Sequence, residues 1–184
     1  MIPYILITYF ITEKCKKIAY KNGKKKNPEE KPLNDLGHYY LPDLDDYHII
    51  PDIILGLYII AILYYGNIKL MKEMSLLMCI IFVFRSILVI STSIPDASGK
   101  CEKKKFQIGY CNDLMFSGHT ATVTLISLYL MSIFPNKRNM LILGNIITYI
   151  LIIASKNHYT IDVLIGDRKS TRLNSSHRCI SYAV

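Results

Sequence analysis

Four long apolar stretches constrain the fold of this chain more than any other feature of its sequence. They run from Ile53 to Met71, from Ser75 to Ile94, from Phe116 to Phe134 and from Asn139 to Ser155. A helix needs roughly 20 predominantly apolar residues to cross the hydrocarbon core of a bilayer, and each stretch is that long or nearly so. The sequence therefore predicts an all-α integral membrane protein.

Two shorter apolar pieces flank these four stretches. One covers residues 1–11, and the other covers residues 159–166. Together the six pieces predict a six-transmembrane-helix bundle in which the first and last helices are incomplete. Between the first piece and the first long stretch, residues 12–31 are polar and rich in Lys, so we expect a solvated loop there.

The apolar pattern stops abruptly where the string "DRKSTRLNSSH" begins at Asp167. Because this string can be back-translated into a common sequencing-library adapter, we predict that residues 167–184 are a non-native tail. The chain then divides into a partial first helix with its Lys-rich loop (1–40), a C-terminally truncated membrane domain (41–166) and this tail.

The charge of the chain does not indicate a nucleic-acid partner. The sequence is 51% hydrophobic, and 22 Lys and Arg residues against 14 Asp and Glu residues give a formal net charge of +8. Part of the excess lies in the tail, and the remainder is too mild to indicate nucleic-acid binding. The expected partner is the membrane, and the oligomeric state is left open.

Short connections decide which loops of the bundle meet. The strings "GNIKLMKEM" and "PNKRN" each join two apolar stretches, so each pair should form an antiparallel helical hairpin. Counting the crossings places residues 31–52, 95–115 and 156–158 on one face of the membrane. Two polar motifs, "CNDLMFSGHT" (111–120) and "HYTID" (158–162), are therefore expected to be neighbours in space.

These two motifs carry the residue types needed for phosphoryl transfer. His158 and Asp162 are four positions apart, so on a helix the carboxylate can hold one imidazole nitrogen and leave the other free to attack. Ser117 is a helix-capping residue type, and with Gly118 it predicts a helix N-terminus that can bind phosphate oxygens. His119 enters the same helix. The combination suggests transfer through a histidine nucleophile.

Both motifs resemble the sphingomyelin synthase family. The family pattern reads C-G-D-x-M-F-S-G-H-T followed by H-Y-T-x-D, and Asn112 stands here in place of its glycine. Two weaker blocks agree: "YLPDLDDYHIIPDI" (40–53) is similar to the family's P-P-L-P-D element, and "RSILVISTSIP" (85–95) is similar to its R-S element. The resemblance covers residues 41–166.

The resemblance implies an enzyme that transfers phosphocholine or a related headgroup from a glycerophospholipid to ceramide and releases diacylglycerol. His158 would be the nucleophile and Asp162 its orienting partner. His119 would protonate the leaving diacylglycerol and then deprotonate the ceramide hydroxyl. Neither a cofactor nor a metal is required by this scheme, and the Cys and His residues show no zinc spacing.

The resemblance also implies the residues that bind the substrates, namely Asp43, Arg85, Asp113, Ser117 and Gly118. The role of Arg85 has two interpretations, because an Arg in a span can contact phosphate or can be a packed structural charge.

The family implies that the motif face is luminal or extracellular, in the Golgi or at the plasma membrane. The excess of Lys on that face would by itself favour the cytosol, and we give the motifs more weight. In an oxidising compartment Cys101 and Cys111 could form a disulfide; the alternative is two free thiols.

Two other functions stay open. A lipid phosphate phosphatase shares the S-G-H and H-x-x-x-D logic but transfers the phosphoryl group to water. Such enzymes usually carry an Arg six positions before the nucleophile, where this chain has Ile152. A non-catalytic membrane protein is the second alternative. The headgroup itself, whether choline, ethanolamine or inositol phosphate, does not follow from the motifs.

Overall fold

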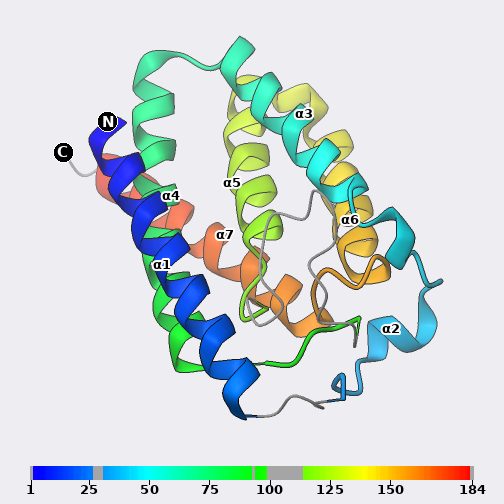
Figure 1. Cartoon of the computed structure of the whole chain (residues 1–184). Coiled ribbons are helices and arrows are strands. Elements are labelled where there is room, and N and C mark those ends of the chain that lie inside the picture. The colour runs from blue at the N-terminus through cyan, green and yellow to red at the C-terminus, as the bar shows by residue number, and fades with distance from the viewer. Residues whose placement is uncertain (1, 27–30, 93, 99–113, 183–184) are drawn as a thin grey trace.

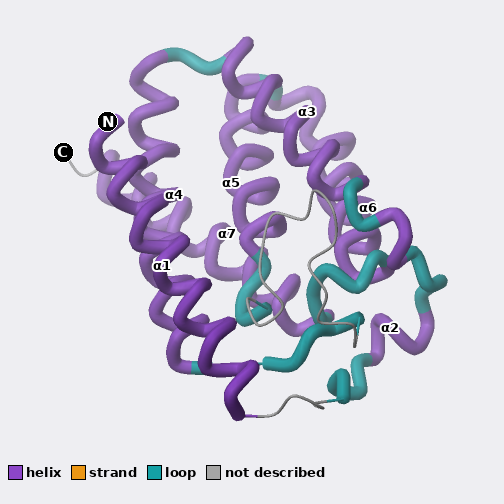
Figure 2. The backbone as a smooth tube through the Cα atoms, in the orientation of Figure 1, coloured by secondary structure: helices purple, strands orange, loops and turns teal. Residues whose placement is uncertain are grey.

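The structure is a computed structural model of the chain, and it describes residues 2–26, 31–92, 94–98 and 114–182. Within these ranges all regular structure is helical, which confirms the all-α prediction (Figures 1 and 2). The elements are α1 (Ile2–Lys26), α2 (Leu36–Tyr40), η1 (Asp45–Tyr47), α3 (Ile50–Tyr65), α4 (Ile68–Ser91), α5 (Gly118–Ile133), η2 (Pro135–Lys137), α6 (Arg138–Ala154) and α7 (Thr160–Tyr182).

Helix α5 is the centre of the bundle. It packs against α3, α4, α6 and α7, and eight consecutive residues from Thr120 to Ser127 are buried. A helix that is buried on every side must be apolar or small all round, and the sequence of α5 has this composition. Its residues Leu125, Ile126 and Tyr129 form the main core with side chains from α3 and α4. The N-terminus of α5 therefore begins among the helices that surround it.

Within the described residues, three helical segments are long and apolar enough to cross a membrane: Asp45–Tyr65, Ile68–Ser91 and Pro135–Ala154. Their large apolar side chains are exposed on the outside of the bundle, for example Leu57 at 60% and Ile87 at 57%. Apolar faces of this extent suit lipid rather than water. These helices indicate an integral membrane protein, while the prediction of six spans is not confirmed.

Helix α1 corrects the prediction of a solvated loop over residues 12–31. The helix continues through Lys26 and packs along α4. Thr12 and Ala19, seven positions apart, are 6% and 2% exposed, and Ser86 donates a hydrogen bond to Thr12 at 3.2 Å. Seven residues are about two helical turns, so both face α4. Because Lys residues fill the other faces, the composition of this segment hid its small buried stripe.

Only one of the two expected hairpins is closely packed. Helices α5 and α6, joined by η2, lie against each other as predicted. Helices α3 and α4 are joined through Gly66 and Asn67 but diverge from this turn (Figure 1). Helix α3 packs on α5 and α6, whereas α4 packs on α1 and α5. The central position of α5 separates the two partners.

Helix α7 continues past the position where the apolar pattern ends. Ser170 is fully buried, and Tyr149 donates a hydrogen bond to Asp167 at 2.9 Å. At Gly166, α7 lies so close to α5 that an added Cβ would be 2.9 Å from the Ser117 carbonyl oxygen. The adapter origin of residues 167–184 stays a prediction.

Candidate functional site

The polar motifs meet at one end of the bundle, as the topology predicted. The imidazole rings of His119 and His158 are 6.4 Å apart between centroids, although 39 positions separate them in sequence. The three segments predicted on this face (31–52, 95–115 and 156–158) also meet here. Asn157 donates to the His48 carbonyl oxygen at 3.0 Å, and the neighbouring Tyr159 donates to the Pro95 carbonyl oxygen at 3.0 Å. The two motifs therefore share one site.

His158 lies in the tight connection between α6 and α7 and is 5% exposed. Its Nδ1 atom is 3.3 Å from the carbonyl oxygen of Leu114 and 3.7 Å from Oδ2 of Asp162. A carbonyl oxygen can only accept a hydrogen bond, so this contact places the ring hydrogen on Nδ1. In the neutral ring Nε2 then carries the lone pair that is needed for attack on phosphorus.

Asp162 is fully buried and links the two motifs. Its Oδ1 accepts from the Phe116 N–H at 3.1 Å, and its Oδ2 accepts from the Tyr159 N–H at 3.3 Å. Its backbone carbonyl oxygen accepts from the Ser117 N–H at 3.1 Å. One carboxylate residue thus holds the start of α7 against the turn that precedes α5.

The turn before α5 is held in an uncommon backbone conformation. Phe116 has φ = 70°, a value that residues other than glycine seldom adopt. Its N–H points to Asp162, and its carbonyl oxygen accepts from Nε of Arg85 at 2.8 Å. Strain of this kind costs about 1–3 kcal/mol and persists where surrounding contacts impose it. Here Asp162 and Arg85 supply such contacts, one at the N–H and one at the carbonyl oxygen of Phe116.

Ser117 and Gly118 begin α5 as the sequence predicted. Ser117 is the N-cap of the helix, and its Oγ accepts from the Thr120 N–H at 3.2 Å. Gly118 is the first residue of the helix and borders the cavity described below. A helix N-terminus that borders a cavity favours negative charge there.

His119 has a carboxylate partner that the sequence analysis did not single out. Its Nε2 lies 2.6 Å from Oδ1 of Asp52, which stands in the first turn of α3. Both side chains are about one-fifth exposed, at 19% and 20%. A sequence signal did exist, because Asp52 is an ionisable residue at the start of a span. Only the packing of α3 on α5 identifies its partner.

A cavity of about 380 Å³ lies between these groups. Its lining combines charged and polar residues with apolar ones from α3 and α4. The charged and titratable members are Lys16, His48, Asp52, Arg85, Asp96, His119, Lys156 and His158. Leu55, Ile59 and Phe82 are among the apolar members. The cavity can therefore accept an anionic group next to an apolar one.

Comparisons with known proteins match the part of the chain that carries both histidine motifs. A family model described as PAP2 superfamily C-terminal matches residues 110–176, which include both histidine motifs. Two relatives are named sphingomyelin synthase-related: one from Caenorhabditis elegans is 26% identical over 80% of this chain, and one from Mus musculus is 25% identical over 74%. The chain is therefore similar to sphingomyelin synthase-related proteins and, over residues 110–176, to the PAP2 superfamily.

A third relative carries another name. A phosphatidylinositol:ceramide inositolphosphotransferase from Trypanosoma cruzi is 33% identical over 47% of this chain. The matches cover 32% of that protein, and 41% and 39% of the two sphingomyelin synthase-related proteins. The chain thus spans about a third to two-fifths of the length of these relatives.

The other residues that the family resemblance implies for substrate binding do not all lie at the cavity. Arg85 is 4% exposed and borders the cavity. Asp43 is exposed and is not among the residues that line the cavity; it forms an ion pair at 2.5 Å with Lys156, which does line it. Asp113, Cys101 and Cys111 lie outside the described residues, so the disulfide and the role of Asp113 stay predictions.

The described residues include no group of three or more His, Cys, Asp or Glu side chains suited to a metal ion. The prediction of a mechanism without metal or cofactor rests, as before, on the family resemblance.

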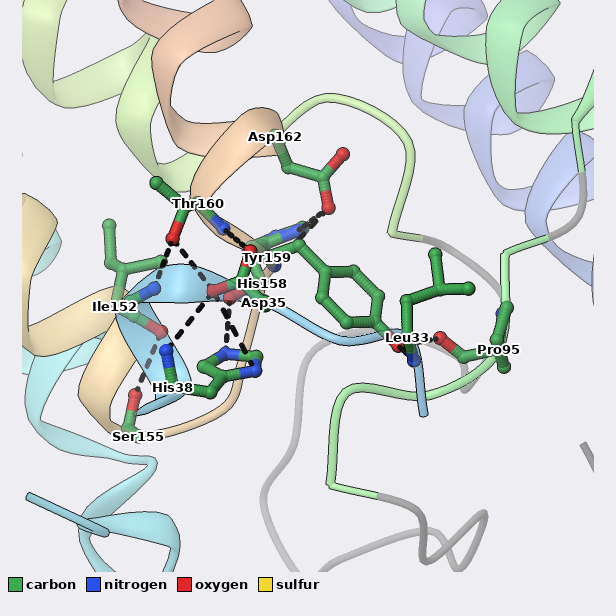
Figure 3. A network of polar contacts seen from close by, with 11 residues as sticks. Leu33, Asp35, His38, Pro95, Ile152, Ser155, His158, Tyr159, Thr160 and Asp162 are labelled. Atoms are coloured by element: carbon green, nitrogen blue, oxygen red, sulfur yellow. Dashed lines mark hydrogen bonds and ion pairs between the residues drawn. The ribbon is translucent and has the colours of Figure 1, made fainter. Parts of the chain in front are cut away.

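A network of polar contacts links Asp35 and His38 to the residues around His158 (Figure 3). Asp35 accepts hydrogen bonds from the Thr160 hydroxyl at 2.7 Å and from the Thr160 N–H at 2.9 Å. Burial opposes ionisation of this carboxyl group, but the bonds from Thr160 and from the His38 N–H outweigh burial and lower the pKa of Asp35 below its ordinary value of 3.8. Asp35 is therefore a carboxylate at neutral pH.

Proposed function

We propose that this chain transfers a phosphocholine or related headgroup from a glycerophospholipid to ceramide, giving a sphingomyelin-type lipid and diacylglycerol. The observation that carries this proposal is the arrangement of His158, whose Nδ1 is engaged by Leu114 and Asp162 while its ring faces His119 across 6.4 Å. A nucleophile and an acid that line one cavity suit a two-step transfer.

In the first step, Nε2 of His158 attacks the phosphorus of the donor lipid. A P–N bond forms, and the P–O bond to diacylglycerol breaks. His119 gives its Nδ1 proton to the leaving oxygen, while Asp52 stabilises the protonated ring at Nε2. The products of this step are diacylglycerol and a phosphohistidine that carries the headgroup.

In the second step, the neutral His119 removes the proton from the primary hydroxyl of ceramide. The resulting oxygen attacks the phosphorus, the P–N bond breaks, and His158 returns to its starting state. His119 is therefore the acid in the first step and the base in the second. Positive charge near the phosphate comes from Arg85 and the N-terminus of α5, which border the cavity.

A specific observation favours inositol phosphate as a second candidate headgroup. The cationic side chains of Lys16, Arg85 and Lys156 line the cavity and disfavour the quaternary ammonium of choline. Glu13 and Asp43 form ion pairs with the two lysines and weaken this effect. The two carboxylates that also line it already contact His119 and Ser98. The name of the relative from Trypanosoma cruzi agrees with an inositol-containing donor.

The apolar lining and the apolar outer faces of α3 and α4 support lipid substrates reaching the cavity from the bilayer. We place the protein in the Golgi or plasma membrane with this site on the luminal or extracellular side, a placement that follows from the family resemblance.

The test uses a host that lacks sphingomyelin synthesis, labelled ceramide, and phosphatidylcholine, phosphatidylethanolamine or phosphatidylinositol as separate donors. A labelled phosphosphingolipid that is lost in His158→Ala would support the transferase and would identify its headgroup. Phosphate release from phosphatidic acid without that product would replace the proposal with a lipid phosphatase. No turnover of either kind would leave the non-catalytic alternative.

A further inference from the structure

The segment Leu33–His38, which precedes α3, contacts three consecutive residues, His158 to Thr160. These three residues are called the nucleophile turn below because His158 is the proposed nucleophile. Asp35 is the N-cap of α2, where it accepts from the His38 N–H at 3.1 Å. The same carboxylate accepts from the backbone and the hydroxyl of Thr160, the first residue of α7 (Figure 3). Asp35 therefore caps both α2 and α7, although Thr160 lies 125 positions after it in sequence.

The start of α7 needs this partner. The first N–H groups of a helix have no carbonyl partner within the helix and must find one elsewhere. Asp162 of α7 itself accepts from the Tyr159 N–H, and Asp35 accepts from the next one, at Thr160. A carboxylate at a helix N-terminus also interacts favourably with the helix dipole. Asp35 thus fixes the end of α7 that carries Asp162.

His38 reaches the nucleophile directly. Its Nε2 lies 3.2 Å from the carbonyl oxygen of His158, so Nε2 carries a hydrogen and donates it. Its Nδ1 is 3.9 Å from Oδ1 of Asp35. The ring also packs against the ring of Tyr159, with 5.5 Å between centroids. His38 thereby holds the backbone carbonyl group of His158, whereas Leu114 contacts its ring.

Space and hydrogen bonding make this contact specific. The Gly37 N–H donates to Oγ1 of Thr160 at 3.2 Å, and a Cβ on Gly37 would overlap that oxygen. Earlier in the same segment, the Leu33 N–H donates to the hydroxyl of Tyr159 at 3.1 Å. Each of the three residues from His158 to Thr160 is therefore held by the segment Leu33–His38.

We propose that Asp35 and His38 form a clasp that positions His158 for attack on the donor phosphate. This inference rests on the proposed function of His158 as nucleophile. Neither clasp residue lines the cavity, and their side chains are only 9% and 12% exposed. They act through the backbone of His158 and the start of α7. Loss of the clasp should lower kcat and leave KM for both lipids nearly unchanged.

The test compares substitutions that remove a clasp contact with substitutions that keep it. His38→Leu removes the donor to the His158 carbonyl, whereas the side-chain amide of His38→Gln can restore it. Misplacement of a reacting group by about 1 Å can cost on the order of 100-fold in rate. We expect a fall in kcat of about 10- to 100-fold for His38→Leu, and a value within about 3-fold of the parent for His38→Gln.

Thr160 offers a second matched pair, because Thr160→Ser keeps the hydroxyl and Thr160→Val removes it at nearly equal volume. Tyr39→Leu, at a neighbouring side chain that is 81% exposed, is the control. Equal losses in His38→Leu and His38→Gln, or a rise in KM with kcat unchanged, would overturn the clasp.

Amide hydrogen exchange of the full chain in lipid nanodiscs separates this inference from the proposed function. Asp35→Asn should speed exchange in peptides covering Thr160, and Asp46→Asn, at an exposed acid in η1, should not. If the parent chain transfers no headgroup, the proposed function fails, and exchange alone decides whether the clasp exists. Unchanged exchange in Asp35→Asn would overturn it.

Discussion

The buried carboxylate of Asp162 accepts the backbone N–H of Phe116 at 3.1 Å, across 46 positions of sequence. Phe116 has φ = 70°, and its carbonyl oxygen faces Arg85 at 2.8 Å. Asp162, the proposed orienting residue of His158, is therefore also the residue that fixes the turn before His119. Chemistry and local folding depend on the same side chain.

Substitution Asp162→Asn should damage both roles. One amide NH2 hydrogen would face the N–H of Tyr159 or of Phe116, so a buried donor would lose its acceptor at a cost of about 1–3 kcal/mol. We expect transfer to fall by about 10²- to 10⁴-fold and the melting temperature to fall with it. Headgroup transfer and thermal unfolding measure the two effects. Parent-like activity in this variant would contradict the orienting role.

The pair of Asp52 and His119 predicts non-additive kinetics. Asp52→Asn should slow transfer, because the protonated form of His119 loses the carboxylate at 2.6 Å. In a background of His119→Gln the same substitution should cost little more, since residues that act as a unit do not add. A double-mutant cycle on kcat/KM measures this coupling. Additive losses would show that Asp52 acts independently of His119.

The close approach of α5 and α7 predicts a strict requirement for glycine at position 166. The Cβ of Gly166→Ala would lie 2.9 Å from the Ser117 carbonyl oxygen, so the two helices must separate. Forcing extra volume into a packed contact costs about 1–3 kcal/mol. Thermal unfolding should show a lower melting temperature. Gly56→Ala is the stability control, because a Cβ there meets nothing within 4 Å; an equal loss in both variants would contradict the prediction.

Packing of α1 on α4 predicts that Ala19 does not tolerate a larger side chain. Ala19→Leu adds volume at a site that is 2% exposed and should destabilise the chain by about 1–3 kcal/mol. Ile18→Ala, at a neighbouring side chain that is 48% exposed, should have little effect. Unfolding followed by circular dichroism in detergent compares the two. Equal stability of both variants would return residues 12–26 to the solvated loop expected from composition.

The lowered pKa of Asp35 predicts a pH dependence of stability. A carboxyl group whose pKa is lower in the folded state stabilises the fold above its unfolded value of 3.8 and loses that contribution as pH falls through the folded value. Unfolding of the parent and of Asp35→Asn should therefore differ most near pH 6 and converge as the pH drops below 3.8. A difference that is constant down to acid pH would show that Asp35 is not ionised in the folded state.

The relation of sequence to site differs from residue to residue. The sequence predicted that Ser117 caps a helix, and that His158 and Asp162 share one end of a helix, because both statements depend on spacings of a few residues. It also predicted that His119 and His158 meet, because span lengths and short loops limit the topology of a membrane bundle. The loop expected over residues 12–31 was wrong through Lys26, since propensity and composition do not reveal a buried stripe of small residues.

By itself, the sequence determined the apolar helices, the two histidine motifs and the end of the bundle at which they meet, because hydrophobic length and helical spacing are local properties. Only the tertiary structure decided the partners: Asp52 for His119, Asp35 and His38 for the nucleophile turn, and Asp162 for Phe116. These contacts span 46 to 125 positions, and their geometry depends on how whole helices pack. A carboxylate in a sequence can serve many donors, and the fold selects the one that it reaches.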